Sequence, residues 1–393
     1  MKPLIYADHA ATTPLSPKVL EAMTPYLTTH FGNPSSLHQA GQVARTAIET
    51  AREQVCNLLH AKKPTEITFT AGGTEADNLA IRGYMQGSKK KHIITTCIEH
   101  PALLETCEAL EKSGCTVTYL PVDGTGMISL EGLEQAMTDD TALVSIMAAN
   151  NEIGTLQPIA EIGALCHARG IVFHTDAVQA MGHIPIDVTE MHIDMLSLSA
   201  HKLHGPKGAG VLYVRTGVYV PAQITGGGQE KNRRSGTENV ANIVGTATAL
   251  SLAIEHMDHD MAYVKGLRDR LTEKVLTLPY SHFTGHPEKR LAGTASYIFE
   301  GIEGEGLLLL LDMHGICCST GSACATGSLE PSHVLMSLGL PHAIVHGSLR
   351  VTLGVDNTEE QIDFIAEKII ASVERLRTMS PVWEKILKGE PIE

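Results

Sequence analysis

The 393-residue sequence lacks several features that would assign it to a particular class of protein. It has no apolar run near the roughly 18 residues that a membrane-spanning helix needs. Its first residues, MKPLIYADHAATTP, contain no apolar segment long enough for a signal peptide. Aspartate and glutamate (44) outnumber lysine and arginine (30), and the formal charge of −14 argues against a large nucleic-acid footprint. We therefore expect a cytoplasmic protein that binds neither membranes nor nucleic acids directly.

The cysteines and histidines also lack the spacing of known structural sites. The eight cysteines are not paired, which favours a reduced chain over a disulfide-bonded one. Among the 20 histidines, His201 and His204 form the pair that most resembles a metal site. Gly205-Pro206 follows this pair, and no CxxC or HExxH motif accompanies it. No metal site is expected.

Short apolar runs alternate with helical patterns over the first two-thirds of the chain. The runs are 67–70, 92–96, 117–120, 143–147, 171–175, 195–199 and 210–214, and helix-length segments such as 74–84, 101–112 and 159–168 lie between most of them. This alternation is typical of right-handed βαβ units and a largely parallel sheet. Only about ten residues separate the last two runs, too few for a crossover helix, so the last strand is expected to be antiparallel to its neighbour.

The pattern changes after about residue 255. A long helical pattern (257–278) is followed by more widely spaced strands (294–299 and 347–352) and by a final helix from 358 to about 377. The sequence therefore predicts an α/β fold with two parts. A large domain, 15–255, contains a mixed, mostly parallel seven-stranded sheet flanked by helices. A smaller α+β domain consists of 1–14 and 256–393.

Polar or reactive residues follow five of the runs, at the point where each run ends. They are Gly72-Gly73-Thr74, Glu99-His100, Asn150-Asn151-Glu152, Asp176 with Gln179, and His201-Lys202. In parallel α/β sheets the ligand crevice lies beyond the carboxyl ends of the strands. We therefore expect these residues to meet in one site.

Gly72-Gly73-Thr74 at the start of a helix offers free backbone N–H groups and a hydroxyl, which suit a phosphate. The alternative is an ordinary capping box, in which Thr74 pairs with Asp77. Neither GxGxxG nor GK[ST] is present here, so dinucleotide and nucleoside-triphosphate binding lack their motifs.

Lys202, Asp176 and His100 narrow the chemistry further. A lysine is usually a surface residue, but one that follows an apolar strand can form a Schiff base. Asp176 alone would be a helix cap; opposite such a lysine it can keep a pyridine nitrogen protonated. His100 is either a core histidine or a group that stacks on a ring and moves protons near its ordinary pKa of about 6.5. A phosphate cradle, a lysine and an aspartate together indicate pyridoxal 5′-phosphate (PLP).

The segment 319–328, STGSACATGS, places the Cys324 thiol among small side chains, a composition typical of a flexible loop. Cys324 is either an incidental cysteine or a nucleophile that reacts as its thiolate.

These residues stand in motifs that resemble those of the cysteine desulfurases of the NifS/IscS type, PLP enzymes of the class V aminotransferase group with fold type I. The motifs run nearly end to end and are YADHAATTP, FGNPSSLH, TFTAGGTEADNLAI, EHPALL, NNEIGT, FHTDAVQAMGHIPID, SLSAHKLHGPKGAGVLYVR, GGGQEKNRRSGTENV, STGSACATGSLEPSHVL and SLRVTLG. The sequence departs from the family at His9, where an asparagine or aromatic residue is usual, and at Cys317-Cys318.

The resemblance implies a homodimer with its sites near the subunit interface, and it implies a role for each matching residue. Lys202 would bind the cofactor as a Schiff base. Gly73, Thr74, Ser199 and His201 would hold the phosphate, with Thr237 of the partner subunit. Asp176 would pair with the pyridine nitrogen, Gln179 and Asn151 would lie beside the ring oxygen, and His100 would stack on the ring. Arg350 would bind the substrate carboxylate, with Asn33 and Asn151 as further substrate contacts.

The implied reaction converts L-cysteine to L-alanine and leaves the sulfur on Cys324 as a persulfide. The sulfur would then pass to an acceptor such as an iron–sulfur scaffold protein or a thiolation enzyme. A selenocysteine lyase or another class V lyase or aminotransferase is the nearest alternative. A catalytically silent scaffold and a metal-dependent hydrolase are more distant ones.

Overall fold

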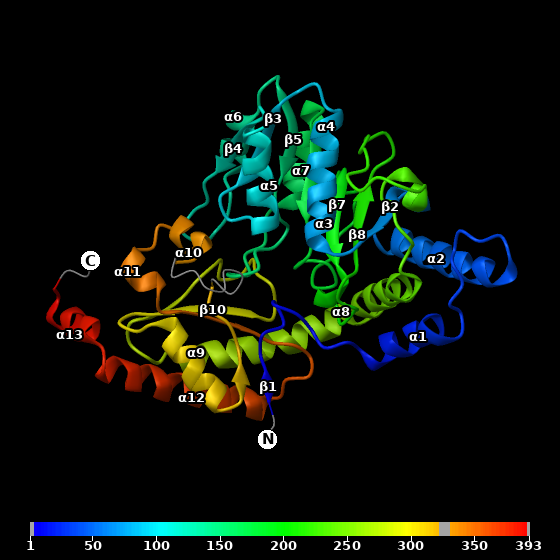
Figure 1. Cartoon of the computed structure of the whole chain (residues 1–393). Coiled ribbons are helices and arrows are strands. Elements are labelled where there is room, and N and C mark those ends of the chain that lie inside the picture. Colours follow the sequence, from blue (N-terminus) through cyan, green and yellow to red (C-terminus); the bar gives the residue numbers. More distant parts are fainter. Residues whose placement is uncertain (1–3, 322–330, 391–393) are drawn as a thin grey trace.

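The computed structural model describes residues 4–321 and 331–390, and its centre is a seven-stranded sheet (Figure 1). The strands are β2 (Ile67–Thr70), β3 (His92–Thr96), β4 (Thr116–Leu120), β5 (Thr141–Ser145), β6 (Val172–Asp176), β7 (Met195–Ser199) and β8 (Gly210–Val214). Their order is β2-β8-β7-β6-β5-β3-β4. Neighbours from β7 to β4 are parallel, whereas β8 is antiparallel to both β2 and β7. The predicted mixed, mostly parallel sheet and its antiparallel last strand are confirmed.

Helices cover both faces of this sheet, so most of its strands are buried on both sides and read as continuous apolar runs. One face packs against α3 (Gly73–Asn78), a π-helical turn (Leu79–Gly83), α4 (Tyr84–Gly87) and α5 (Pro101–Glu111). The other packs against α1 (Pro17–Thr28), α2 (Gln39–Leu58), α6 (Leu130–Ala136), α7 (Ile159–Arg169) and the first half of α8 (Val240–Val275). Short 3-10 turns lie at Pro64–Glu66, Ala200–Lys202 and Gln229–Asn232.

A second, smaller core lies below the large sheet in Figure 1. Here β10 (Thr294–Phe299) pairs antiparallel with β9 (Ser281–Phe283) and β12 (Ser348–Thr352). The helices α9 (Gly304–Met313) and α12 (Glu359–Thr378) and the second half of α8 bury their apolar faces against this sheet. The remaining elements are β1 (Ile5–Tyr6), which is parallel to β11 (Ile316–Cys317), and the short helices α10 (His333–Ser337), α11 (His342–Val345) and α13 (Pro381–Lys388).

The longest helix differs from its prediction. The sequence pattern predicted a helix over 257–278, but α8 begins 17 residues earlier, at Val240, and ends at Val275. Its Leu250 belongs to the large core and its Leu267 to the small one, so one rigid element is shared by both. The predicted division of the chain at 255/256 falls inside this helix, and it stays a prediction.

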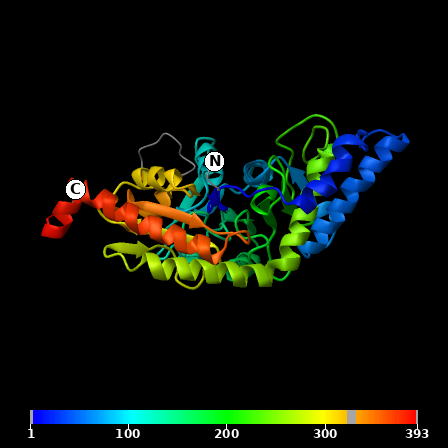
Figure 2. The ribbon, with the colours of Figure 1, turned by 90° about the horizontal axis from the view of Figure 1, so that it is seen from below.

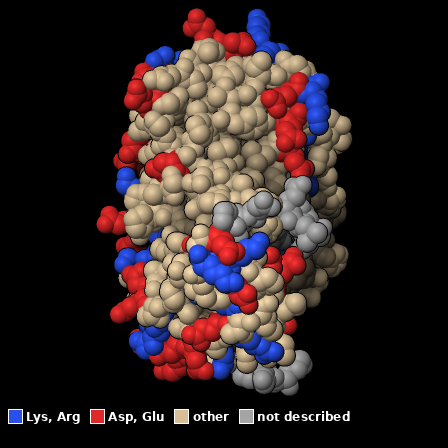
Figure 3. Space-filling view, turned by 90° about the vertical axis from the view of Figure 1, so that its left-hand side faces the viewer, with Lys and Arg blue, Asp and Glu red and all other residues tan. Residues whose placement is uncertain are grey.

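Figure 2 shows α8 and α12 side by side along the underside of the molecule, where Arg270 of α8 binds Asp363 of α12. On the face in Figure 3, acidic and basic side chains are interspersed rather than gathered by sign. Among the helices described, none is both long and apolar enough to cross a membrane.

Candidate active site

A cavity of about 290 Å³ lies where the carboxyl ends of β6 and β7 face β12 and the segment that follows β1. Ten of the predicted site residues line it: Gly73, Thr74, His100, Asn151, Asp176, Gln179, Ser199, His201, Lys202 and Arg350. They come from segments up to 277 positions apart in the sequence, from Gly73 to Arg350. Each of the five strand ends contributes at least one residue to this cavity, whereas Gly72, Glu99, Asn150 and Glu152 do not line it.

Lys202 is held by the chain that follows β1. It ends the 3-10 turn after β7, and its Nζ donates to the carbonyl oxygens of Ala10 and Ala11. Gln179 donates to the same Ala10 oxygen (3.0 Å), and Thr13 Oγ1 donates to the carbonyl of His201 (2.8 Å). The segment ADHAATT therefore forms a wall of the cavity and orients the lysine, a role that the sequence motif alone did not reveal.

The start of α3 forms the opposite end of the cavity. An open recess continues from it, and Gly73, Thr74, Ser199 and His201 line both spaces. These are the four residues that the resemblance assigned to the phosphate. A side chain at position 73 would lie 2.7 Å from Val178 Cγ2, so glycine is required for this close approach. Gly72, with φ of 153°, adopts a backbone conformation that also favours glycine.

Two buried aspartates face each other in the cavity, and the sequence predicted a role there for only one. The spacing of Asp77 from Thr74 also fits a capping box, but the Asp77 side chain is buried and lines the cavity with Asp176. Burial and the negative charge of Asp176 raise the pKa of Asp77. Burial also raises the pKa of Asp176, but the Val178 N–H and the positive charge of Lys202 oppose it. We assign the proton to Asp77 and the negative charge to Asp176.

His100 is neutral in this site, which corrects the expectation that it titrates near 6.5. Burial, followed by the charges of Lys202 and His333, lowers its pKa to about 4. Its Nδ1 accepts from the backbone N–H of Ala102 (3.1 Å) at the start of α5. The neutral ring therefore carries its proton on Nε2.

Arg350 lies on β12 with its guanidinium almost fully buried. Nη2 binds Asp8 Oδ1 (3.0 Å) and Nη1 donates to the carbonyl oxygen of Asn151 (3.1 Å). Within the described residues its Nε has no hydrogen-bond partner. A buried donor of this kind is costly unless a ligand satisfies it, and a carboxylate is the acceptor that suits guanidinium best.

The lining therefore fits the predicted cofactor in three respects. It has a lysine amine, an ionised aspartate for a ring nitrogen, and a glycine-lined helix start beside hydroxyl and imidazole groups for a phosphate.

Comparisons with known proteins agree with this chemistry. The family model described as aminotransferase class-V matches residues 5–365. A cysteine desulfurase IscS from Clostridium botulinum (strain Hall) is 52% identical over 395 residues, which cover 99% of both chains. The chain belongs to the cysteine desulfurases of the class-V aminotransferase family. Enzymes of this family depend on PLP.

Solved structures show the same fold for this desulfurase. A protein described as NifS-like superposes with a TM-score of 0.90 at 39% identity, covering 95% of this chain and all of the other. A structure described as SspA in complex with cysteine superposes with a TM-score of 0.79 at 39% identity, covering 90% of this chain and 99% of the other.

Three predicted site residues are not among those lining the cavity. Asn33 is exposed in the segment between α1 and α2, and its Oδ1 accepts from the Ser35 N–H (2.9 Å). Thr237 is exposed in the loop before α8, and its predicted role in the other subunit stays a prediction. Cys324 lies outside the described residues.

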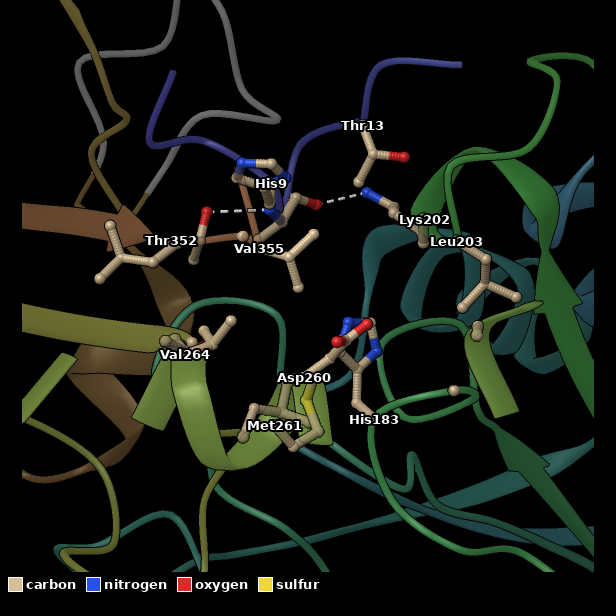
Figure 4. Close-up of a pocket in the computed structure, with 18 of the residues that line it drawn as sticks. His9, Thr13, His183, Lys202, Leu203, Asp260, Met261, Val264, Thr352 and Val355 are labelled. Carbon is tan, nitrogen blue, oxygen red and sulfur yellow. Dashed lines mark hydrogen bonds between the residues drawn. The ribbon is translucent and has the colours of Figure 1, made fainter. Parts of the chain in front are cut away.

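A second cavity, of about 110 Å³, is also lined by Lys202 (Figure 4). It shares Lys202, Ala10 and Gln179 with the first cavity, and His9 lines it. Burial, followed by the charge of His204, lowers the pKa of His9 to about 4. A side chain at Gly354 would overlap the His9 ring. The unusual histidine in the desulfurase motif is thus a neutral residue packed between the two cores.

The two adjacent cysteines before the predicted nucleophile are not activated. Burial, followed by the negative charge of Asp8, raises the pKa of Cys318 to about 12. Burial, followed by the charge of Asp312, also raises the pKa of Cys317. Both are thiols rather than thiolates at neutral pH, and a thiol is a poor nucleophile.

Proposed function

We propose that this desulfurase binds PLP through Lys202, converts L-cysteine to L-alanine, and takes the sulfur onto Cys324 as a persulfide. The single observation that supports this best is the one cavity lined by Lys202, Asp176, His100 and Arg350. When bound, PLP supplies an electron-withdrawing ring that makes the Cα proton of an amino acid acidic. Asp176 would sustain that ring's positive nitrogen, because its own negative charge faces the cavity.

Arg350 orients the substrate. Asp8 and the Asn151 carbonyl already fix the guanidinium, so little side-chain entropy is lost when its remaining donors bind a carboxylate. This contact selects substrates that carry a carboxylate.

Two side chains of the cavity, Lys202 and His100, can transfer protons. Lys202 does so at Nζ, beside the carbonyls of Ala10 and Ala11. His100 does so at Nε2, which carries the proton of the neutral ring because Nδ1 accepts from Ala102. With Nδ1 bonded to the Ala102 N–H and the proton on Nε2, this ring can donate a proton into the cavity but has no free lone pair with which to accept one.

Cys324 accepts the sulfur from the substrate. Its thiolate attacks the sulfur of the bound substrate, so that an S–S bond forms and the substrate Cβ–S bond breaks. The electron pair of the broken bond stays with the carbon, which takes up a proton and becomes the methyl group of alanine. The persulfide then passes to a sulfur acceptor, for which iron–sulfur cluster assembly is the pathway suggested by the IscS relatives.

The first experiment measures alanine and sulfide together after incubation of the purified enzyme with L-cysteine and a thiol reductant. We expect equal release of both products. We expect neither product from Cys324→Ala or Lys202→Ala, because one lacks the sulfur-accepting thiol and the other the amine. A yellow protein that releases no alanine would contradict the proposed reaction but would still support PLP binding. Sulfide release that survives in Cys324→Ala would contradict the role of the thiol.

A further inference from the structure

Asn150, Asn151 and Glu152 form a tight turn beyond β5 whose side chains point in different directions. Asn150 Oδ1 accepts from the N–H groups of Glu152 (2.9 Å) and Ile153 (3.0 Å), and its Nδ2 donates to the Ile98 carbonyl (2.9 Å). Asn151 lines the cavity, whereas Glu152 does not. The turn is rigid because its first side chain is fully buried and fully bonded.

The Glu152 carboxylate contacts two residues that are far from it in sequence. Ser332 Oγ donates to Glu152 Oε2 (2.5 Å), and both residues are buried. Gly321 packs against the same oxygen, since a Cβ atom at position 321 would lie 2.9 Å from Oε2 and 3.3 Å from Ser332 Cβ. Gly321 and Ser332 therefore meet at a single carboxylate.

These two residues flank the segment that contains Cys324. Gly321 precedes Cys324 by three positions and Ser332 follows it by eight. Ser332 is itself fixed, because its Oγ also accepts from the Leu335 N–H (3.2 Å) as the N-cap of α10. Ser332 is therefore hydrogen-bonded to the turn that presents Asn151 to the cavity, and Gly321 packs closely against the same turn.

We propose that Glu152 is a positioning residue for the sulfur-transfer step, holding both ends of the Cys324 segment at a fixed place relative to the cavity. The proposal rests on the proposed function, in which Cys324 accepts the sulfur. Sulfur transfer needs the thiol and the substrate sulfur to meet in a productive geometry, and small misplacements of reacting groups are costly.

The hydrogen bond from Ser332 requires an acceptor oxygen at position 152, but that oxygen need not carry a negative charge. Burial raises the pKa of Glu152 to about 7, although the Ser332 hydroxyl and Arg350 oppose this effect. A protonated carboxyl and a glutamine amide each keep one oxygen that can accept from Ser332. Glu152→Gln is therefore the conservative variant and Glu152→Ala the disruptive one.

Two substrates separate positioning from general damage to the site. L-Cysteine needs the thiol of Cys324. β-Chloro-L-alanine needs the same cavity but no thiol, since it loses chloride with its electron pair and ends as pyruvate and ammonia. A residue that only supports the cavity would affect both reactions.

The experiment compares both rates in wild type, Glu152→Ala, Glu152→Gln and Cys324→Ala. For Glu152→Ala we expect alanine formation from L-cysteine to fall by about tenfold or more, because small misplacements of reacting groups are costly. Chloride release from β-chloro-L-alanine should stay within about twofold of wild type, and Glu152→Gln should recover most of the cysteine rate. Gly321→Ala, which leaves Glu152 in place, should reproduce the selective loss if Glu152→Ala fails to fold.

The matched control is Glu66→Ala. Glu66 is another buried carboxylate; it accepts from the Lys62, Lys63 and Thr216 N–H groups and does not line the cavity. The Glu66→Ala variant should either lower the rates with L-cysteine and β-chloro-L-alanine by the same factor or leave both unchanged. An unchanged cysteine rate in Glu152→Ala, or equal loss of both reactions, would overturn the proposal while leaving the desulfurase reaction intact. A wild-type cysteine rate in Cys324→Ala would instead overturn the proposed function, and the positioning role with it.

Discussion

The paired aspartates of the cavity give the most direct test at the scale of single residues. Asp77 is assigned a proton and Asp176 a negative charge, and asparagine mimics a protonated aspartate in shape. Asp77→Asn should therefore cost less than about tenfold in alanine formation. Asp176→Asn should lower the rate of alanine formation by about 100-fold or more, since breaking a buried ion pair costs about 3–5 kcal/mol.

The measurement combines the alanine rate with the PLP absorbance that remains after dialysis. Asp176→Asn should lose cofactor as well as rate, whereas Asp77→Asn should keep its colour. Equal losses in the two variants would show that the charge is shared between the carboxyls.

Residue types and strand ends were enough to predict most of the cavity, because the carboxyl ends of parallel strands meet at one edge of the sheet. Asp77 was missed because its spacing from Thr74 also fits a local cap, and only packing against β6 and β7 buries it. The contacts of Glu152 could not be predicted either, since Ser332 lies 180 positions away.

At the scale of elements, close helix packing makes some glycines necessary and leaves others replaceable. A Cβ atom on Gly163 of α7 would overlap the carbonyl oxygen of Met191, whereas one on Gly266 of α8 would meet no atom within 4 Å. Gly163→Ala should lower the free energy of unfolding by about 1–3 kcal/mol through overpacking. Gly266→Ala should raise it by up to about 1 kcal/mol through helix propensity.

Thermal unfolding of the two variants checks this pair. Both should keep the wild-type alanine rate at 25 °C, since neither glycine lines the cavity. A higher melting temperature for Gly163→Ala would show that α7 can shift without cost.

Strands were easier to predict than helix boundaries. Buried strands are short apolar runs, and β2, β3, β7, β8 and β10 have the predicted bounds. The N-terminal half of α8 was missed because its apolar residues face α1 and α2 as well as the sheet, which weakens the one-sided pattern of an amphipathic helix. The sequence did not predict α13, a short helix with no buried residue.

At the scale of the whole molecule, the predicted homodimer can be tested by mixing inactive subunits. Lys202→Ala and Thr237→Val should each be impaired alone. If Thr237 serves the other subunit's site, a mixed dimer contains one site with both native residues. A 1:1 mixture exchanged through unfolding and refolding should then regain about a quarter of wild-type sites.

The alanine rate of the mixture, compared with that of each variant refolded alone, measures this recovery. A rate equal to the average of the two parents would place Thr237 in its own subunit's site or in none.

The wall around Lys202 also sets when the site can form during protein synthesis. The ribosome makes the segment with Ala10 well before β12, yet Ala10 is bonded to Thr352 and neighbouring Asp8 to Arg350, both of which lie on β12. Until β12 has left the exit tunnel, the lysine has only part of its surroundings. If the site binds PLP, we therefore expect binding only after β12 has been made, and a ribosome stalled before residue 350 would carry a nascent chain without a complete site.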